Sequence, residues 1–257
     1  MSTPEMLLWA TAAVYPLLCV MERLLPAREL PRVRGWSLTG IGFFAVYASI
    51  SWFLPQALPA AWFESSLLDG GALGVAGGAL VGYAATTLAG YAWHRAAHRV
   101  PLLWRMFHQM HHAPRRLDAA GAAVFHPTEM ALYTVLGVVV MGPLLGLDPT
   151  AASIVGLLGV FNAVFQHANL RTPRWLTWFM QRPEAHSIHH SHGVHAWNYS
   201  DFPLWDRLFG TYREGLGFQP RVGFDAPQEA RWLAMALFQD VHAEQRDRAP
   251  AVPESAR

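Results

Sequence analysis

Five apolar stretches occupy most of the first two thirds of the chain, and their lengths limit the folds open to it. The hydrocarbon core of a bilayer is about 30 Å thick, so a helix of roughly 20 apolar residues crosses it. Backbone polar groups in lipid must pair internally, which restricts such segments to helices or closed barrels. The pattern predicts an all-α, polytopic membrane bundle of four or five transmembrane helices. The stretches cover residues 6–25, 36–62, 71–93, 130–147 and 151–165.

The composition agrees with a membrane protein that also has polar segments. Apolar residues make up 53% of the 257 residues and charged residues only 14%, which is too apolar for an ordinary soluble domain. The first stretch has few flanking charges and no small-residue cleavage site, so we interpret it as a retained transmembrane helix and not as a signal peptide. A net charge of +1, without a basic patch that contains aromatic residues, gives no indication of nucleic-acid binding.

The later apolar stretches differ in character. The second carries Pro55 and Pro59, so we expect it to span and then break into an interfacial segment. The third is rich in glycine and alanine, and small residues let helices approach closely, which predicts a central position in the bundle. The fourth and fifth are short for a crossing and are joined by residues 148–150. They form either a full hairpin or one that dips into the membrane and returns.

Three short histidine runs follow the third and fifth stretches. On a helix, positions i, i+3 and i+4 lie on one face, so each run directs two or three imidazoles the same way. A lone histidine is more often a core residue than a ligand, but stacked histidines gain nothing from packing. Neutral imidazole binds zinc, copper and iron, and three such faces offer more nitrogens than one metal accepts, which predicts a site for two metals. The runs are His94-Arg-Ala-Ala-His98, His108-Gln-Met-His111-His112 and His186-Ser-Ile-His189-His190.

Four histidines outside the runs are weaker candidates. His167 ends the fifth stretch on the same side as the runs, so we favour it as an additional ligand. His126 precedes Pro127, a residue suited to the first position of a helix. For His126 the roles of ligand, support of a ligand and helix start stay equally open. His192 and His195 break the spacing of the runs, and we expect them to lie outside the metal site.

Arginines are distributed asymmetrically about the apolar stretches. Residues 23–34, 95–116 and 171–182 contain four, five and three of them, whereas the opposite loops carry only acidic residues such as Glu64 and Asp148. Cytoplasmic loops carry the excess of positive charge in membrane proteins. The N-terminus is therefore expected outside, with all three histidine runs in a helical cap that faces the cytosol.

The remaining sequence is expected to cover the site and extend beyond it. Residues 192–212 are polar and aromatic, as suits a cap packed over a site at the bilayer surface. Residues 226–246 predict one amphipathic helix on the cap or at the membrane interface, and residues 248–257 are expected to be disordered. We therefore divide the chain into a membrane domain at 1–225 and a C-terminal segment at 226–257.

The order of these motifs resembles a known family. The series HRxxH, HxxHH, FHP, HANL, a second HxxHH, then NY and LWDRLFGTY is similar to the fatty acid hydroxylase/sterol desaturase superfamily of integral membrane di-iron proteins, in particular to its bacterial-type members. The likeness covers residues 91–212, about half of the chain, and the earlier helices match only in character. The HxxxH spacing of the first run is that of sterol desaturases, whereas some members have HxxxxH.

The resemblance implies a catalytic membrane domain that holds two iron ions, and zinc on the same nitrogens stays open for the purified protein. It implies O₂ as the oxidant. Electrons are expected from NAD(P)H through a separate protein of cytochrome b5, ferredoxin or reductase type, because no fused cytochrome b5 domain is present. Carried over position by position, the metal ligands are His94, His98, His108, His111, His112, His167, His186, His189 and His190.

Neutral imidazoles leave the charge of two metal ions uncompensated, so carboxylates are expected behind the ligands. Within the family we favour hydroxylation of an alkyl C–H bond in a fatty acyl, sterol-like or other lipid, since the short chain with a compact cap resembles bacterial hydroxylase-like members. Desaturation begins with the same hydrogen abstraction at the same site and stays open. The candidates for supporting residues are Asp118, Glu184, Asp201 and Asp206, together with His126 and Asn198.

A membrane metal transporter or sensor is the main alternative from another class. Transporters usually place polar ligands near the bilayer midplane, whereas the apolar stretches here contain almost none. A haem protein would need histidines on opposing helices within the bilayer. A hydrolytic zinc site would be expected to carry HExxH, which is absent. The sequence therefore predicts an integral membrane oxidoreductase, located in a bacterial inner membrane.

Overall fold

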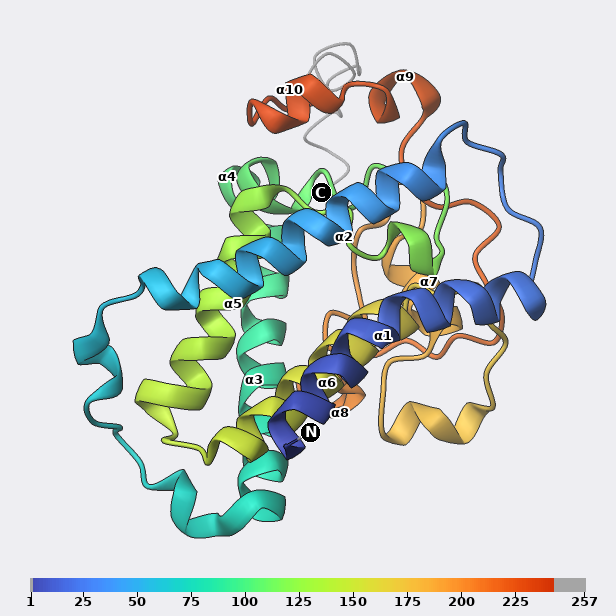
Figure 1. Cartoon of the computed structure of the whole chain (residues 1–257). Helices are drawn as coiled ribbons and strands as arrows, with labels where there is room; N and C mark the ends of the chain where they lie inside the picture. Colours follow the sequence, from blue (N-terminus) through green and yellow to red (C-terminus); the bar gives the residue numbers. More distant parts are fainter. Residues whose placement is uncertain (1, 243–257) are drawn as a thin grey trace, which may run out of the picture.

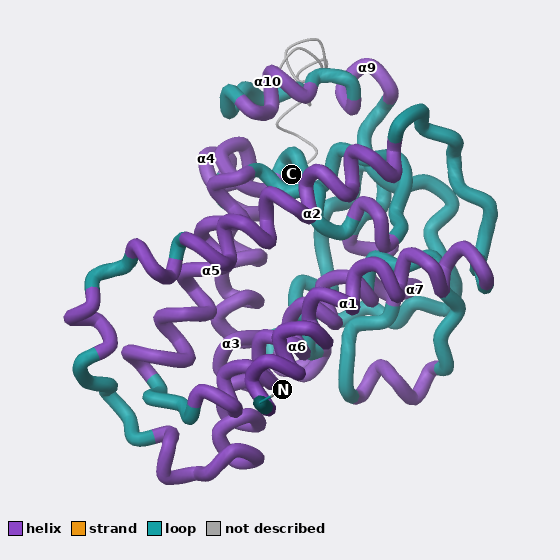
Figure 2. The backbone as a smooth tube through the Cα atoms, in the orientation of Figure 1, coloured by secondary structure: helices purple, strands orange, loops and turns teal. Residues whose placement is uncertain are grey.

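The computed structural model describes residues 2–242 and consists of helices and loops (Figures 1 and 2). Within this part of the chain, the only extended pairing is a single bridge between Ser191 and Val222. The predicted all-α fold is confirmed. The long helices are α1 (Thr3–Leu24), α2 (Trp36–Phe53), α3 (Gly74–Arg99), α5 (Pro127–Val139) and α6 (Pro149–Phe165).

Four helical stretches are long and apolar enough to cross a membrane. They are Glu5–Leu24, Trp36–Ala57, Gly70–Arg99 and Pro127–Leu144. The last of these joins α5 to a π-helical turn, η6 (Val140–Leu144). The apolar helix α6 has only 17 residues and packs against both α1 and α3. The protein is therefore an integral membrane helical bundle, with the number of spans expected from the sequence.

Local sequence explains where these helices begin and break. Ser2 and Glu5 form a reciprocal capping box at the start of α1, which satisfies otherwise unpaired backbone N–H groups. The Asp148 side chain accepts from the first N–H groups of α6. The second span breaks after Leu54 into short 3₁₀ turns, as the prolines predicted. These turns are η1 (Pro55–Ala57), η2 (Ala60–Phe63) and, before α3, η3 (Gly70–Leu73).

The bundle is built from two helix pairs joined by α3. α1 packs along α6 and α2 packs along α5, while α3 contacts both α5 and α6, in the central position that its small residues predicted. At Gly82 of α3, a Cβ atom would lie 2.6 Å from Leu147 and 2.9 Å from Val155. A larger residue would force these two side chains to move, so glycine favours the close approach of α3 to the α6 region.

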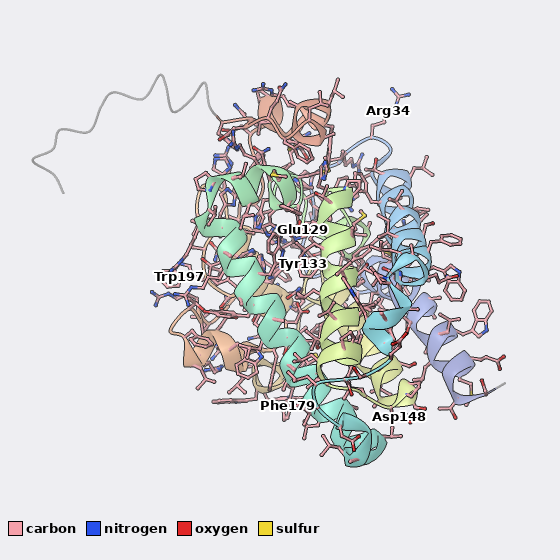
Figure 3. The ribbon with its side chains drawn as sticks, turned by 90° about the vertical axis from the view of Figure 1, so that its left-hand side faces the viewer. Arg34, Glu129, Tyr133, Asp148, Phe179 and Trp197 are labelled. Atoms are coloured by element: carbon pink, nitrogen blue, oxygen red, sulfur yellow. The ribbon has the colours of Figure 1, made fainter. Side chains whose placement is uncertain are left out.

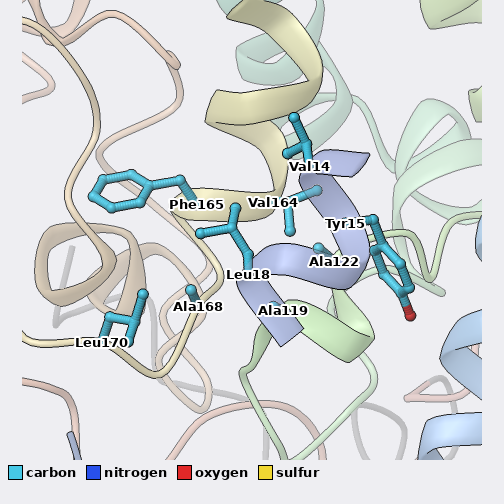
Figure 4. Close-up of a cluster of buried hydrophobic side chains, with 9 residues drawn as sticks. All are labelled: Val14, Tyr15, Leu18, Ala119, Ala122, Val164, Phe165, Ala168 and Leu170. Carbon is cyan, nitrogen blue, oxygen red and sulfur yellow. The ribbon is translucent and has the colours of Figure 1, made fainter. Parts of the chain in front are cut away.

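A buried apolar cluster joins the C-terminal half of α1 to the loops that surround the histidines. Figure 4 shows side chains of α1 and α6 meeting those of the 119–122 and 168–170 segments. Beside it, the carboxylate of Glu22 accepts hydrogen bonds from the backbone N–H groups of Ala119 (2.8 Å) and Asn169 (3.0 Å). These contacts hold two cap loops on the end of one membrane span. The clustered residues are Val14, Tyr15, Leu18, Ala119, Ala122, Val164, Phe165, Ala168 and Leu170.

The cap consists of short helices between long loops. It includes α4 (Pro101–Leu103), the π-helical turn η4 (Trp104–His108), η5 (Ala119–Gly121), η7 (Arg174–Trp178), α7 (Pro183–His189), α8 (Pro203–Leu208), α9 (Ala226–Glu229) and α10 (Trp232–Ala236). Most of these elements lie at one end of the bundle (Figure 1).

The prediction of one amphipathic helix over 226–246 is wrong for the described residues. The chain forms two short helices, α9 and α10, separated at Arg231. The side chain of Gln109 donates to the carbonyl of Gln239 (2.8 Å) and accepts from Val241 N–H (3.0 Å). These bonds hold the chain after α10 in a non-helical conformation against the cap. The segment 248–257, expected to be disordered, lies outside the described residues.

Candidate metal centre

The three histidine runs meet in the structure and form two groups. Within each group, one ring nitrogen from every residue lies within 4.8 Å of the others. The first group contains His94, His98, His108, His112 and His189, and the second contains His111, His167, His186 and His190. The nine histidines expected as ligands are the nine that these groups contain. Their role as ligands remains a prediction.

Each HxxHH run contributes to both groups. His108 and His112 belong to the first group, whereas His111 between them belongs to the second. In α7 the division is reversed, since His189 joins the first group while His186 and His190 join the second. The two groups therefore share the same two helical segments as a common wall, and one cannot be displaced without the other.

The distances between ring nitrogens fit a metal ion in each group. The Nε2 atoms of His108 and His112 are 3.1 Å apart, and Nε2 of His167 lies 3.1 Å from that of His111 and 3.2 Å from that of His186. Nitrogens bound about 2.0–2.1 Å from one metal at right angles are about 3 Å apart. The Nε2 atoms of His94, His98, His189 and His190 are buried without a hydrogen-bond partner. An unpaired buried acceptor is costly, and a metal ion at each group would satisfy these atoms.

Electrostatics favours the neutral, ligating form of the imidazoles. Burial, reinforced by the neighbouring imidazoles, holds the pKa of each histidine in the second and third runs well below its usual value. Burial also lowers the pKa of His167 to about 4. Since a protonated ring cannot bind a metal ion, these shifts keep lone pairs available at neutral pH.

Backbone carbonyls orient several rings. The Nδ1–H groups of His94 and His189 donate to the carbonyls of Tyr199 (2.6 Å) and Trp197 (2.7 Å). In the second group, His167 donates from Nδ1 to Ala163 (2.6 Å). A hydrogen bond from Nδ1 selects the tautomer whose Nε2 lone pair points at the metal. The loop at 197–199 therefore controls ring orientation in the first group.

Glu129 is a site residue that sequence reasoning missed. Its Oε1 accepts a hydrogen bond from His108 Nδ1 at 2.8 Å, and both side chains are fully buried. Figure 3 shows Glu129 on α5, one turn from Tyr133. Its sequence position, two residues after Pro127, suits an acid in the first turn of a helix and does not by itself indicate a link to the histidines. The available signal was its position as the only charged residue of an otherwise apolar span, at 127–144.

Two of the expected supporting acids bind elsewhere in the cap. Asp118 accepts from the indole N–H of Trp36 (2.9 Å) and pairs with Arg116, which fastens a cap loop to α2. Glu184 accepts from both the backbone N–H and the hydroxyl of Thr172, at 2.8 and 2.7 Å. It thereby anchors the start of α7, so its link to the histidines runs through the helix and not through a direct bond.

Asn198 and Asp206 hold the loop that orients His94 and His189. Asn198 has a left-handed backbone (φ 48°) and donates from Nδ2 to the carbonyl of Ala185 on α7 at 2.8 Å. Asp206 accepts from the N–H groups of Tyr199 (2.9 Å) and Ser200 (2.8 Å). Both residues thus position carbonyls that face the first group. Asp206 is buried, and desolvation raises its pKa to about 6.

The other candidates lie around the two groups. Asp201 accepts from Gln166 Nε2 at 2.8 Å, and burial raises its pKa to about 6. His126 caps α5 and donates from Nε2 to the carbonyl of Ala236 at 3.3 Å; it belongs to neither group. His195 approaches the Nδ1 atom of His112 at 3.2 Å. His192 bonds to the carbonyl of Gly223 at 2.8 Å, outside the groups as expected.

A cavity of about 500 Å³ leads from the histidines into the membrane bundle. Five rings line it near the site, His94 and His108 from the first group and His111, His167 and His186 from the second. Its walls come from both helix pairs and from α3, and it extends as far as Leu7 of α1 and Met141 of η6. Most of the lining is apolar, and Tyr47, Tyr83 and Tyr133 are among the residues that border it. The histidines thus stand at one end of a space suited to an alkyl chain.

Comparison with known proteins identifies the family to which this chain is related. The model of the fatty acid hydroxylase family matches residues 79–211, just over half of the chain. The chain belongs to the fatty acid hydroxylase family. The matched region contains all nine grouped histidines and Glu129. The resemblance to this superfamily that was inferred from the motifs is therefore confirmed.

Several proteins similar in sequence to this chain are named as hydroxylases. A fatty acid hydroxylase of Lecanicillium sp is 31% identical over 51% of this chain and 40% of the relative. Cholesterol 25-hydroxylase of Homo sapiens is 27% identical over 48% of this chain and 46% of its own length. Sphingolipid C4-hydroxylase of Saccharomyces cerevisiae is 29% identical over 49% and 37%, respectively. The matches thus span less than half of each relative. No solved structure matches this chain.

Proposed function

We propose that this protein is a membrane-bound, non-haem di-iron oxidoreductase that uses O₂ and external electrons to hydroxylate an alkyl C–H bond of a lipid. The observation that carries the proposal is the meeting of two buried histidine groups at the end of an apolar cavity between membrane helices. The names of its relatives, which are fatty acid, cholesterol and sphingolipid hydroxylases, support the same reaction class.

In this proposal each histidine group holds one iron ion. The donor set is entirely nitrogen, which suits iron, and equally zinc in a purified sample. The bound pair would supply the redox chemistry that activation of O₂ and of an unactivated C–H bond requires, which no side chain provides. Zinc on the same nitrogens would leave the protein inactive, because zinc has no redox chemistry.

The residues of the chain have four tasks around the metals. Low pKa values keep the imidazoles neutral. Glu129 and the carbonyls of Tyr199 and Trp197 hold the rings in one orientation. The cap loops exclude bulk water from the buried groups. The cavity binds the alkyl part of the substrate and places one carbon beside the histidines, with Asp201 and Gln166 as polar neighbours in its wall.

The setting of the reaction follows from the charge pattern. We propose that the N-terminus faces outside and the histidine groups face the cytoplasm, with the protein in a bacterial inner membrane. A separate electron-transfer protein, fed by NAD(P)H and of cytochrome b5, ferredoxin or reductase type, would dock on the cytoplasmic side. Residues 1–225 would form the catalytic unit and residues 226–257 a separate C-terminal segment, of which residues 226–242 pack on the cap.

Metal analysis combined with lipid profiling tests the proposal. The protein is purified in mild detergent from iron-supplemented cells, and lipids of cells with and without the gene are compared by mass spectrometry. Close to two irons per chain and a lipid that gains one oxygen are expected. A lipid that loses two hydrogens would instead indicate desaturation at the same site. One metal or none, with unchanged lipids, would contradict the proposal and favour a transporter or sensor.

A further inference from the structure

Two short elements outside the long helices carry a strongly apolar surface. They are η7, which precedes the third histidine run in sequence, and α8, which follows it, and the two pack against each other. Their large side chains are 39–64% exposed, which is unusual for a surface that faces water. We call this surface the η7–α8 face. It consists of Trp175, Trp178, Phe179, Leu204, Leu208 and Phe209.

The η7–α8 face lies beside the middle of a membrane span. The indole N–H of Trp205 donates to the Thr87 hydroxyl at 3.0 Å, and the ring of Phe209 stacks on that of Tyr91 with centroids 5.2 Å apart. Thr87 lies twelve residues before the end of α3 at Arg99, roughly 18 Å along the helix. Figure 1 shows α8 beside the bundle, well away from α9 and α10.

The same face of α3 continues into lipid-facing surface. Leu80 lies seven residues before Thr87, so the two share one side of the helix, and Leu80 is strongly exposed. The apolar surface of α8 and that of the span are therefore continuous. Figure 3 agrees, because Phe179 lies on the side of the bundle, away from the end that carries α9 and α10.

The arginines around the η7–α8 face are arranged as an apolar environment requires. The guanidinium of Arg207 lies 4.5 Å from the Trp178 ring and 3.8 Å from the Tyr212 ring, so aromatic faces cover it. Cation–π contacts gain strength when the cation is removed from water. In contrast, Arg171, before η7, and Arg174, its first residue, are exposed, where they can meet anionic lipid head groups.

We propose that the η7–α8 face is immersed in the bilayer leaflet on the histidine side, as a non-spanning anchor that fastens the cap to the membrane. Trp175, Trp178 and Phe179 would enter the leaflet together with α8, while Arg171 and Arg174 stay at the head groups. The occupant of this surface is lipid, because the face continues the lipid-exposed side of α3 at the same depth. The inference is independent of the reaction at the histidines.

Site-directed labelling of the full-length protein in lipid nanodiscs tests the proposal. Cys19, the only cysteine, is replaced by serine, and single cysteines are introduced as Trp178→Cys and Leu208→Cys. Leu80→Cys serves as the bilayer control, and Val194→Cys, exposed in the cap beside charged residues, as the aqueous control. Each variant is assayed for its rate with a charged maleimide and, after labelling with a small fluorophore, for quenching by spin-labelled lipid.

The proposal expects Trp178→Cys and Leu208→Cys to behave like Leu80→Cys. Both should react with the charged maleimide at least an order of magnitude more slowly than Val194→Cys, and spin-labelled lipid should quench their fluorophores several-fold more strongly. Fast reaction without quenching would place the face in water and overturn the proposal. Protection from the maleimide without quenching would mean that protein covers the face, either a second copy or an electron donor, and would also overturn it.

Discussion

The two histidine groups are built from the same helices but differ in how they are supported and exposed. The first has five rings, and the buried carboxylate of Glu129 stands behind one of them, His108. The second has four rings, of which His111 and His167 bond to backbone carbonyls and none pairs with a carboxylate in the described residues. Three of the four rings in the second group border the cavity, against two of five in the first.

This difference indicates unequal roles for the two proposed metals. A metal with fewer protein ligands keeps positions open for small molecules, as catalytic sites generally do. The second group combines fewer rings with more contact to the cavity, so its metal would meet the substrate more directly. The first group, with an additional ring and an anionic partner, would hold its metal more tightly.

The largest effects are expected when one ring is removed from each group. His189→Ala should empty the first group and His111→Ala the second, each with loss of about one iron per chain and of all measurable turnover, because a lost ligand also leaves its partners unpaired. Metal analysis and product assays check this. Membrane insertion, measured by fractionation, should be intact in both variants. Full metal content and turnover in both would refute the two-metal interpretation.

Glu129→Ala should produce the next largest effect, and it should fall on the first group. Loss of a carboxylate behind a metal-binding histidine typically lowers metal affinity or activity by about 10–100-fold. Iron release to a chelator should therefore begin from the first group. Glu129→Gln keeps the shape and an acceptor oxygen but removes the charge, so it should recover only part of the affinity, whereas a merely steric role would predict full recovery. Equal iron retention in all three proteins would contradict the assignment.

Asp201→Ala should affect the cavity beside the second group and spare metal content. The carboxylate accepts from Gln166, the residue before His167, and hydrogen bonds to charged groups are worth about 1.5–3 kcal/mol. We expect turnover to fall roughly tenfold at normal iron content. Asp201→Asn separates charge from shape, since it keeps the size and an acceptor oxygen. A loss of iron in either variant would move Asp201 from the cavity wall to the metal site.

His192→Ala should have the smallest effect. Its ring bonds to the carbonyl of Gly223 and is partly exposed, so its removal should cost about 1 kcal/mol of stability or less. Iron content and turnover should stay close to those of the unmodified protein. Thermal unfolding and metal analysis alongside His189→Ala provide the comparison. A loss as large as that of His189→Ala would place His192 among the ligands.

The membrane spans and the converging histidines could be predicted from sequence because each produces a strong periodic signal. Apolar runs of membrane length predicted the spans, and the repeated histidine spacing predicted which rings would converge. Both signals are local, since helical geometry translates spacing directly into a shared face. The division of each HxxHH run between two groups was not predicted, because it depends on how α7 and η4 face each other.

The features that sequence missed depend on long-range packing. Glu129 looked like an ordinary acid at a helix start, and only the fold brings it to His108. The single helix expected over 226–246 was wrong, because Gln109 binds the chain near Gln239 and ends the helical path. The helices η7 and α8 are each too short to be predicted as membrane elements from sequence. Their exposure beside α3 becomes visible only in three dimensions.

Because both groups take histidines from the same two segments, evolution cannot easily alter one group by inserting or deleting residues. Each added or deleted residue rotates a helix by about 100°, so a one-residue insertion before α7 would displace rings of both groups at once. Neither half can be lost through such an insertion or deletion while the other is kept intact. A designer who wanted a one-iron version would need point substitutions at His111 or His189, and could not shorten or shift a helix.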